Sequence, residues 1–134
     1  MASLRFYEVV LDCPEPRVLA EFYRRLLGWE YEAGHEVDDP EGDDWLRLLA
    51  PHGGPKLAFQ RSTAPVTPWR EDSRAHVDVA VEDLAAAHDH ALAQGATPVT
   101  GTPEDEGHPD DRFRVYADPA GHVFCLVQPT DPVL

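Results

Sequence analysis

The fold is decided by residues 75–95, AHVDVAVEDLAAAHDHALAQG, which place a short strand directly before a helix. In the first half of this stretch apolar residues alternate with polar ones, so His76 and Asp78 lie on the same face of the strand. Asp83 is a typical N-cap, and Gly95 suits the left-handed position that ends a helix. The stretch therefore predicts one strand–helix unit.

The first half of the chain contains the same order in residues 8–28, EVVLDCPEPRVLAEFYRRLLG. Glu8 precedes Gly28 by 20 residues, much as His76 precedes Gly95 by 19. Such a correspondence indicates an internal repeat, in which each copy is one small supersecondary unit.

The segments that follow the two helices extend the repeat. Arg47 precedes Gly54 as Arg114 precedes Gly121, and the two sets differ by 67 positions. Both halves read strand–helix–strand–strand–strand, and each is too small to bury the face of its own sheet. We therefore expect an α+β fold, with two βαβββ modules forming one curved mixed sheet around a cleft.

The length of 134 residues fits a single domain. We expect a first module at about residues 4–61, a linker at 62–74 and a second module at about 75–129. The apolar positions of the predicted strands and helices should supply much of the core. These positions are Tyr7, Val9, Leu11, Val18, Phe22, Leu26, Val77, Val79, Val81, Leu84, Leu92, Val115, Phe124 and Leu126.

Composition excludes several classes of partner. Lys and Arg total 11 against 25 Asp and Glu, which gives a net charge of −14. A chain so acidic has no basic surface for nucleic acid or for an anionic membrane. No apolar run reaches the roughly 20 residues of a membrane span, and the acidic N-terminal stretch does not resemble a signal peptide. With only two cysteines, we expect a reducing cytoplasmic location.

Several stretches together resemble a known family. They are LDCPEPRVLAEFYRRLLGW, LAFQ, HVDVAVEDLAAAHDHALAQGA and ADPAGHVFCLV. The chain resembles the vicinal oxygen chelate superfamily, and within it the glyoxalase/bleomycin-resistance/dioxygenase proteins with a glyoxalase-like domain. The resemblance implies two βαβββ modules that enclose a cleft, and commonly a homodimer.

The same resemblance implies a metal site with one ligand on the first strand and one on the last strand of each module. These positions fall on Glu8, Gln60, His76 and Cys125. Strand alternation should turn these four side chains to the cleft face and their neighbours Tyr7, Phe59, Phe124 and Leu126 to the opposite face. The divalent ion would be Zn, Ni, Mn or Fe, and Glu8 would be a ligand or catalytic base. Metal-dependent members usually have Glu where this chain has Cys125. That departure leaves a site without metal open.

Each candidate also has a purely structural explanation. His76 can be an ordinary surface or core histidine, Gln60 is a neutral and weak ligand, and Cys125 between Phe124 and Leu126 can be a small apolar filler. A thiolate at Cys125 would prefer a borderline-soft ion such as zinc.

Four further residues are candidates for contact with a small-molecule ligand. Asp78 lies beside His76, and Trp69 in the predicted linker can line the site or pin the linker. Arg47 and Arg114 occupy matching positions and can receive an anionic group in the cleft, or form ion pairs with some of the acidic residues.

Three functions remain open from the sequence. The first is a small-molecule-binding protein of the bleomycin-resistance kind, without a complete metal site. The alternative is a divalent-metal-dependent lyase, isomerase or dioxygenase. A silent dimeric domain that binds another protein is a third reading.

Overall fold

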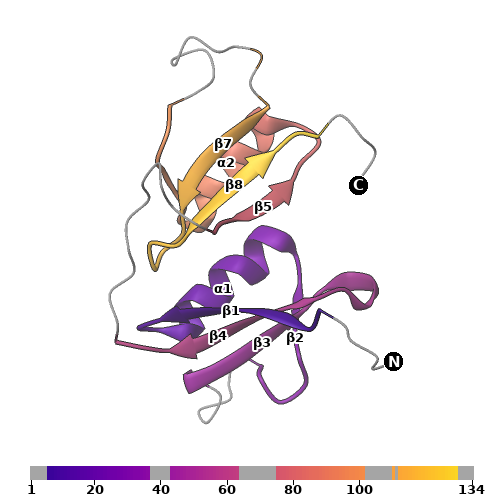
Figure 1. The fold of residues 1–134 in the computed structure, drawn as a ribbon, viewed down its shortest axis with the longest axis vertical. Coiled ribbons are helices and arrows are strands. Elements are labelled where there is room, and N and C mark those ends of the chain that lie inside the picture. The colour runs from indigo at the N-terminus through magenta and orange to yellow at the C-terminus, as the bar shows by residue number, and fades with distance from the viewer. Residues whose placement is uncertain (1–5, 37–42, 64–74, 102–109, 111, 130–134) are drawn as a thin grey trace. The chain divides into compact units, whose positions relative to one another are not determined.

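The computed structural model describes residues 6–36, 43–63, 75–101, 110 and 112–129 (Figure 1). The chain divides into two compact units, residues 1–65 and 66–134, and each is described by itself. Trp69 lies outside the described residues.

The first unit is a mixed sheet with one helix packed against it (Figure 1). Its sheet has the strand order β1-β4-β3-β2, in which β1 and β4 are parallel and the other neighbours are antiparallel. In chain order the elements are β1 (Glu8–Cys13), α1 (Pro16–Leu27), β2 (Glu30–Tyr31), β3 (Trp45–Leu49), the 3-10 turn η2 (Pro51–Gly53) and β4 (Lys56–Arg61).

Helix α1 begins and ends where its sequence favours it. Pro16 occupies the first turn, where a missing N–H costs nothing. Gly28 adopts φ 71°, a left-handed conformation, and donates its backbone N–H to the carbonyl of Arg24 at 2.9 Å. Phe22 and Tyr23 are buried, and the Tyr23 ring stacks on Phe59 of β4 with centroids 5.9 Å apart. These aromatic contacts fix the helix on the sheet.

Register assigns the two faces of the first sheet. Leu11 and Leu46 both pair with Phe59, so these three side chains face α1. Because side chains alternate along a strand, Ala58 and its partner Arg47 face the other way. In each sheet, the face that points away from the helix is called the distal face below.

The second unit repeats this arrangement. Its sheet has the order β5-β8-β7-β6, with β5 and β8 parallel. The elements are β5 (Val77–Ala80), α2 (Leu84–Gln94), β6 (Thr97–Pro98), β7 (Phe113–Ala117) and β8 (Val123–Val127). The predicted α+β class with two βαβββ modules is therefore confirmed. The described residues form two four-stranded sheets, one in each unit, where the sequence predicted one curved sheet.

Helix α2 has the predicted ends. The Asp83 carboxylate accepts a hydrogen bond of 3.1 Å from the backbone N–H of Ala86, and Gly95 ends the helix at φ 112°. Ala91 is its one fully buried residue, so apolar packing holds α2 less firmly than α1. Among the described residues, no helix has both the length and the apolar character that crossing a membrane requires.

The predicted core is correct in its centre and wrong at three positions. Phe22, Val115, Phe124 and Leu126 are buried. Tyr7, Val18 and Leu92 are instead exposed to 47%, 50% and 39%. Tyr7 precedes the first residue of β1, so strand alternation does not govern it. Val18 and Leu92 lie on helix faces that point away from the sheets, because each helix buries only a narrow stripe.

Candidate functional site

Strands β5 and β8 bring three polar side chains together in the second unit. Asp78 pairs in register with Cys125, and His76 lies two residues before Asp78 on the same face. The Nε2 atom of His76 is 3.1 Å from Oδ1 of Asp78. One ligand atom from each of these residues lies within 4.8 Å of the other two. We call these three residues the His–Asp–Cys cluster.

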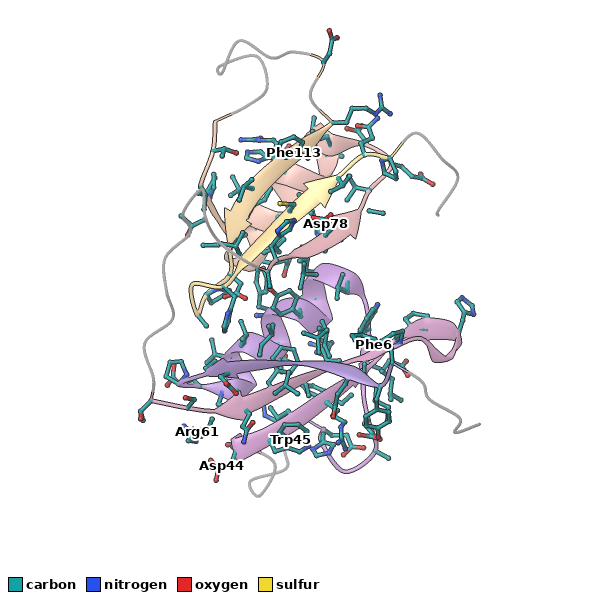
Figure 2. All side chains as sticks on the ribbon, viewed as in Figure 1. Phe6, Asp44, Trp45, Arg61, Asp78 and Phe113 are labelled. Carbon is teal, nitrogen blue, oxygen red and sulfur yellow. The ribbon has the colours of Figure 1, made fainter. Side chains whose placement is uncertain are left out.

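The cluster forms one side of a hollow on the distal face of the second sheet. The hollow has a volume of about 420 Å³ and is completed by three apolar side chains, Phe113, Val115 and Val127. Figure 2 shows Asp78 and Phe113 on the sheet of β5, β8 and β7. Phe113 is half-exposed at the edge, whereas Val115 is buried. The hollow therefore has apolar walls and one polar corner.

The Cys125 thiol is held in its protonated form. Burial raises its pKa to about 11, and the charge of Asp78 and a hydrogen bond to that carboxylate act in the same direction. A thiol with this pKa is not a ready nucleophile at neutral pH.

Glu8 lies on the distal face of the first sheet, where an arginine engages its carboxylate. Arg47 Nε donates to Oε2 of Glu8 at 2.9 Å, and Nη2 donates to Oε1 at 3.3 Å. The Arg47 guanidinium also lies 5.0 Å from the Trp45 ring centroid and 5.5 Å from that of Tyr7. This ion pair and hydrogen bond raise the pKa of Arg47 above its ordinary value. Glu8 is thus committed to a fork-shaped ion pair.

Gln60 shares the distal face with Glu8 but is not close to it in register. Gln60 pairs with Asp12 on β1 and with Trp45 on β3, while Glu8 pairs with Lys56. Lys56 and Gln60 are four positions apart on β4, which corresponds to roughly 13 Å of extended strand. The two predicted ligands of the first module therefore do not form a pair.

The four-ligand metal site implied by the family resemblance does not fit these residues. Glu8 is occupied by Arg47, Gln60 lies along the strand from it, and Cys125 offers sulfur instead of a carboxylate oxygen. A hard divalent ion prefers oxygen ligands. The first unit supplies no paired donors for one at these positions.

Arg114 lies on the opposite face from the one predicted. It pairs with Leu126, faces α2, and is only 7% exposed. The prediction relied on an offset of 67 residues from Arg47. Strand pairing instead matches Arg47 with Ala117. Arg47 pairs with Ala58, the residue before Phe59 of β4, and Ala117 pairs with Val123, the residue before Phe124 of β8. The offset between these matching residues is three residues longer than the 67 counted along the sequence. Because an odd shift turns a side chain to the other face of a strand, Arg114 does not share the face of Arg47.

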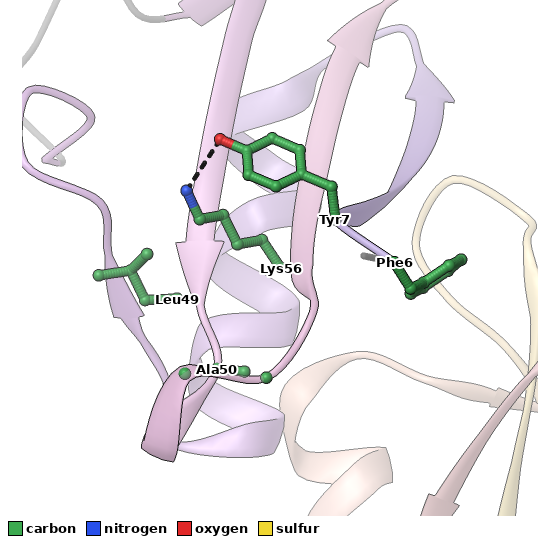
Figure 3. Close-up of a pocket in the computed structure, with 7 residues that line it drawn as sticks. Phe6, Tyr7, Leu49, Ala50 and Lys56 are labelled. Carbon is green, nitrogen blue, oxygen red and sulfur yellow. Dashed lines mark hydrogen bonds between the residues drawn. The ribbon is translucent and has the colours of Figure 1, made fainter. Parts of the chain in front are cut away.

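A second hollow lies in the first unit, beside the start of β1 (Figure 3). It has a volume of about 370 Å³ and is lined by Phe6, Tyr7, Leu49, Ala50, Gly53, Gly54 and Lys56. Lys56 donates a hydrogen bond of 3.1 Å to the Tyr7 hydroxyl and one of 3.0 Å to Glu32. The charge of Lys56 is therefore already balanced within the unit. The contact also shows that Tyr7 lies on the same side of the sheet as Lys56, where the sequence predicted the opposite side.

Sequence reasoning did not single out two residues of the hollow in the second unit, Phe113 and Val127. They pair with each other across β7 and β8, and they lie on the same face as Cys125. The signal was present in the alternation of FRVYA and VFCLV, because the odd-numbered residues of both strands share one face.

Comparisons with known proteins agree with this architecture. A family model described as a glyoxalase-like domain matches residues 8–127. No curated protein matches the sequence. Among solved structures, a glyoxalase/bleomycin resistance protein/dioxygenase family enzyme from Burkholderia phytofirmans PsJN is 12% identical, with a TM-score of 0.69 over 93% of this chain and 98% of that one.

Two further solved structures share the fold. A glyoxalase/dioxygenase from Nostoc punctiforme is 15% identical, with a TM-score of 0.69 over 95% of this chain and 92% of that one. TnmS3, an antibiotic binding protein from Streptomyces sp. CB03234, is 17% identical, with a TM-score of 0.60 over 97% and 99%. At these identities the likeness shows the fold alone. The family match covers nearly the whole chain, and this protein therefore belongs to the glyoxalase-like domain family, as the resemblance to the vicinal oxygen chelate superfamily predicted.

Proposed function

We propose that this protein binds a small organic molecule in the hollow on the distal face of the second sheet. The observation that supports this proposal is the composition of the hollow, which has apolar walls and one polar corner. Sites for small molecules are typically concave and mostly apolar, with a few polar groups that orient the ligand. The solved structure of an antibiotic binding protein with the same fold supports binding as a use of this architecture.

The ligand class follows from the groups that line the hollow. Phe113, Val115 and Val127 offer contacts to a ring or an aliphatic chain. Asp78 offers an exposed carboxylate, which favours a cationic or hydrogen-bond-donating group. The net charge of −14 attracts cations over long distances as well. The ligand that fits best is a compact apolar molecule with one amine.

The donor set favours binding over the alternative of a divalent-metal-dependent lyase, isomerase or dioxygenase of the family type. That chemistry needs a metal with several fixed ligands and open positions. In the first unit, Glu8 is held by Arg47 and is not paired with Gln60.

Assembly as a homodimer is part of the proposal. Apolar side chains on the first and second units are well exposed, with Phe6 at 66%, Val10 at 40% and Phe113 at 50%. Association of two copies would remove such surface from water. Light scattering at micromolar concentration should give about twice the chain mass of 14.9 kDa, and a mass equal to one chain would reject the dimer.

The binding proposal is tested by titrating isotope-labelled protein with three naphthalene probes of the same size. They are 1-naphthylmethylamine, 1-naphthylmethanol and 1-naphthoate, and backbone amide shifts report the site. We expect the amine to bind most tightly and to shift amides of β5, β7 and β8. Asp78→Asn should remove the preference for the amine and leave binding of the alcohol unchanged. Equal affinity of wild type for all three probes would contradict the assigned role of Asp78.

A further inference from the structure

We propose that the His–Asp–Cys cluster of the second unit is a binding site for one thiophilic divalent cation, with Zn²⁺ as the ion that fits best. The proposal rests on the proposed function in one respect, because the ion would occupy the polar corner of the same hollow. It differs from the four-ligand pattern implied by the resemblance. All its donors come from one unit, and one of them, Asp78, has no place in that pattern.

The strand geometry places the three donors side by side. His76 and Asp78 are two residues apart, so both point to the distal face, and Cys125 is the register partner of Asp78 on the adjacent strand. Their ligand atoms lie within 4.8 Å of one another. Donors that share a tetrahedral zinc ion, at bond lengths of roughly 2.0–2.3 Å, lie about 3.5 Å apart. Small rotations of exposed side chains close this difference.

Two side chains of the cluster can move and the third is fixed, an arrangement that suits capture of an ion. The side chains of His76 and Asp78 are 48% and 59% exposed, so they can rotate. Cys125 is 7% exposed and fixed on β8 between Phe124 and Leu126. A cation arriving from solvent meets two adjustable ligands above one fixed sulfur.

The donor set selects the ion. An imidazole nitrogen, a carboxylate oxygen and a sulfur make a borderline-soft site, which suits zinc better than magnesium, calcium or manganese. On binding, the Cys125 S–H bond is broken, a Zn–S bond forms and the proton passes to solvent. A thiolate, a carboxylate and a neutral imidazole then balance the two positive charges of the ion. No oxidation or reduction takes place.

Three protein ligands leave one position of a tetrahedral ion for water or for a ligand atom of a bound molecule. The remaining lining of the hollow is apolar, through Phe113, Val115 and Val127. With the ion in place, the preferred small molecule is an apolar compound with one nitrogen, oxygen or sulfur donor.

The test uses untagged, reduced protein and Co²⁺ as a spectroscopic substitute for Zn²⁺. A cobalt–thiolate bond produces an intense charge-transfer band in the near ultraviolet, which neither histidine nor aspartate alone can give. We expect this band in wild type, with tetrahedral ligand-field bands in the visible, and its loss on addition of about one equivalent of Zn²⁺. Absence of the band in wild type would overturn the proposal.

Matched variants assign the donors. Cys125→Ser should abolish the band, whereas Cys13→Ser should keep it, because Cys13 is also buried but lies on β1 of the first unit. Asp78→Asn and His76→Gln should each weaken Zn²⁺ binding by at least about tenfold in calorimetry, since each removes one ligand. A band that persists in Cys125→Ser, or that is lost only in Cys13→Ser, would contradict the site. Backbone amide spectra of each variant report whether the fold is retained.

One comparison separates this inference from the proposed function. Metal-free wild type is titrated with 1-naphthylmethylamine, and the protein without amine is titrated with Co²⁺. Amine binding without a cobalt–thiolate band overturns the metal site and leaves the proposed function in place. A cobalt–thiolate band without amine binding supports the metal site and overturns the proposed binding of cationic apolar molecules to the metal-free hollow.

Discussion

Arg114 donates a hydrogen bond of 2.7 Å from Nη1 to Nδ1 of His88, and this bond ties α2 to β7. The hydroxyl of Tyr116 lies 2.8 Å from the same ring nitrogen. Since a guanidinium can only donate, Nδ1 of His88 must carry no proton. Burial and the charge of Arg114 both lower the pKa of His88 below 6.5. The neutral histidine is therefore part of the attachment of α2 to its sheet.

The first prediction is a loss of stability in mild acid that depends on His88. A histidine with a lowered folded-state pKa stabilises the fold fully above its unfolded value of 6.5, and that contribution is lost as pH falls below 6.5. The urea midpoint of wild type should therefore fall between about pH 7.5 and about pH 5.5 by more than that of His88→Gln. His90→Gln, on the same helix, is the control and should behave like wild type. Equal falls of the urea midpoint in wild type and His88→Gln would show that the attachment of α2 through Arg114 does not require a neutral His88.

The second prediction concerns the packing of α1. Phe22 is 1% exposed and meets the Tyr23 ring edge-to-face at 4.9 Å, whereas Val18 on the same helix is 50% exposed. Phe22→Ala should lower the free energy of unfolding by about 3–5 kcal/mol, because it removes a ring and leaves a cavity. Val18→Ala should change it by less than about 1 kcal/mol. Chemical denaturation measures both free energies of unfolding. Similar losses in the two variants would contradict the assignment of the Phe22 face of α1 to the sheet.

The third prediction concerns the ion pair between Glu8 and Arg47. Their side chains are 14% and 24% exposed, and the contact is fork-shaped. A double-mutant cycle with Glu8→Gln and Arg47→Met should give a coupling free energy of about 1 kcal/mol. Glu8→Gln should leave the affinity for Zn²⁺ unchanged. A large loss of Zn²⁺ affinity in Glu8→Gln would restore Glu8 as a metal ligand.

The fourth prediction compares two glycines. Gly95 has φ 112°, where a side chain is strained, whereas Gly54 has φ −70° and an added Cβ would meet only Ala50 at 3.5 Å. Gly95→Ala should destabilise the protein by about 1 kcal/mol or more, because the helix end requires a left-handed residue. Gly54→Ala should be neutral or slightly stabilising. Equal stability of the two variants in thermal unfolding would contradict the assigned conformation of Gly95.

Local sequence patterns predicted much of the fold because the forces involved are local. Both glycine helix ends and the Asp83 cap follow from backbone preferences of single residues. Alternation correctly placed Glu8 and Gln60 on the face opposite Phe59. It also placed Cys125 on the other face of its strand from Phe124 and Leu126. These predictions needed only the two-residue period of a strand.

The errors arose where the answer depends on register or on distant partners. Arg114 was assigned by counting along the chain, yet strand pairing and loop length decide which residue matches Arg47, and the match is Ala117. The partner of the Glu8 carboxylate could not be read from the sequence either, because it is an arginine 39 residues away. The sequence placed Asp78 beside His76, but only the strand register shows that Asp78 also lies beside Cys125. No local pattern contains this information.

The most direct test of the account is the amide-shift titration of metal-free protein with 1-naphthylmethylamine, carried out on wild type, Phe113→Ala and Phe6→Ala. The two phenylalanines are 50% and 66% exposed, but only Phe113 lines the hollow of the second unit. We expect shifts on β5, β7 and β8 in wild type, affinity about tenfold weaker in Phe113→Ala, and no change in Phe6→Ala. Shifts confined to β1, β3 and β4, or equal affinity of Phe113→Ala and wild type, would contradict the assignment of the binding site to the second unit.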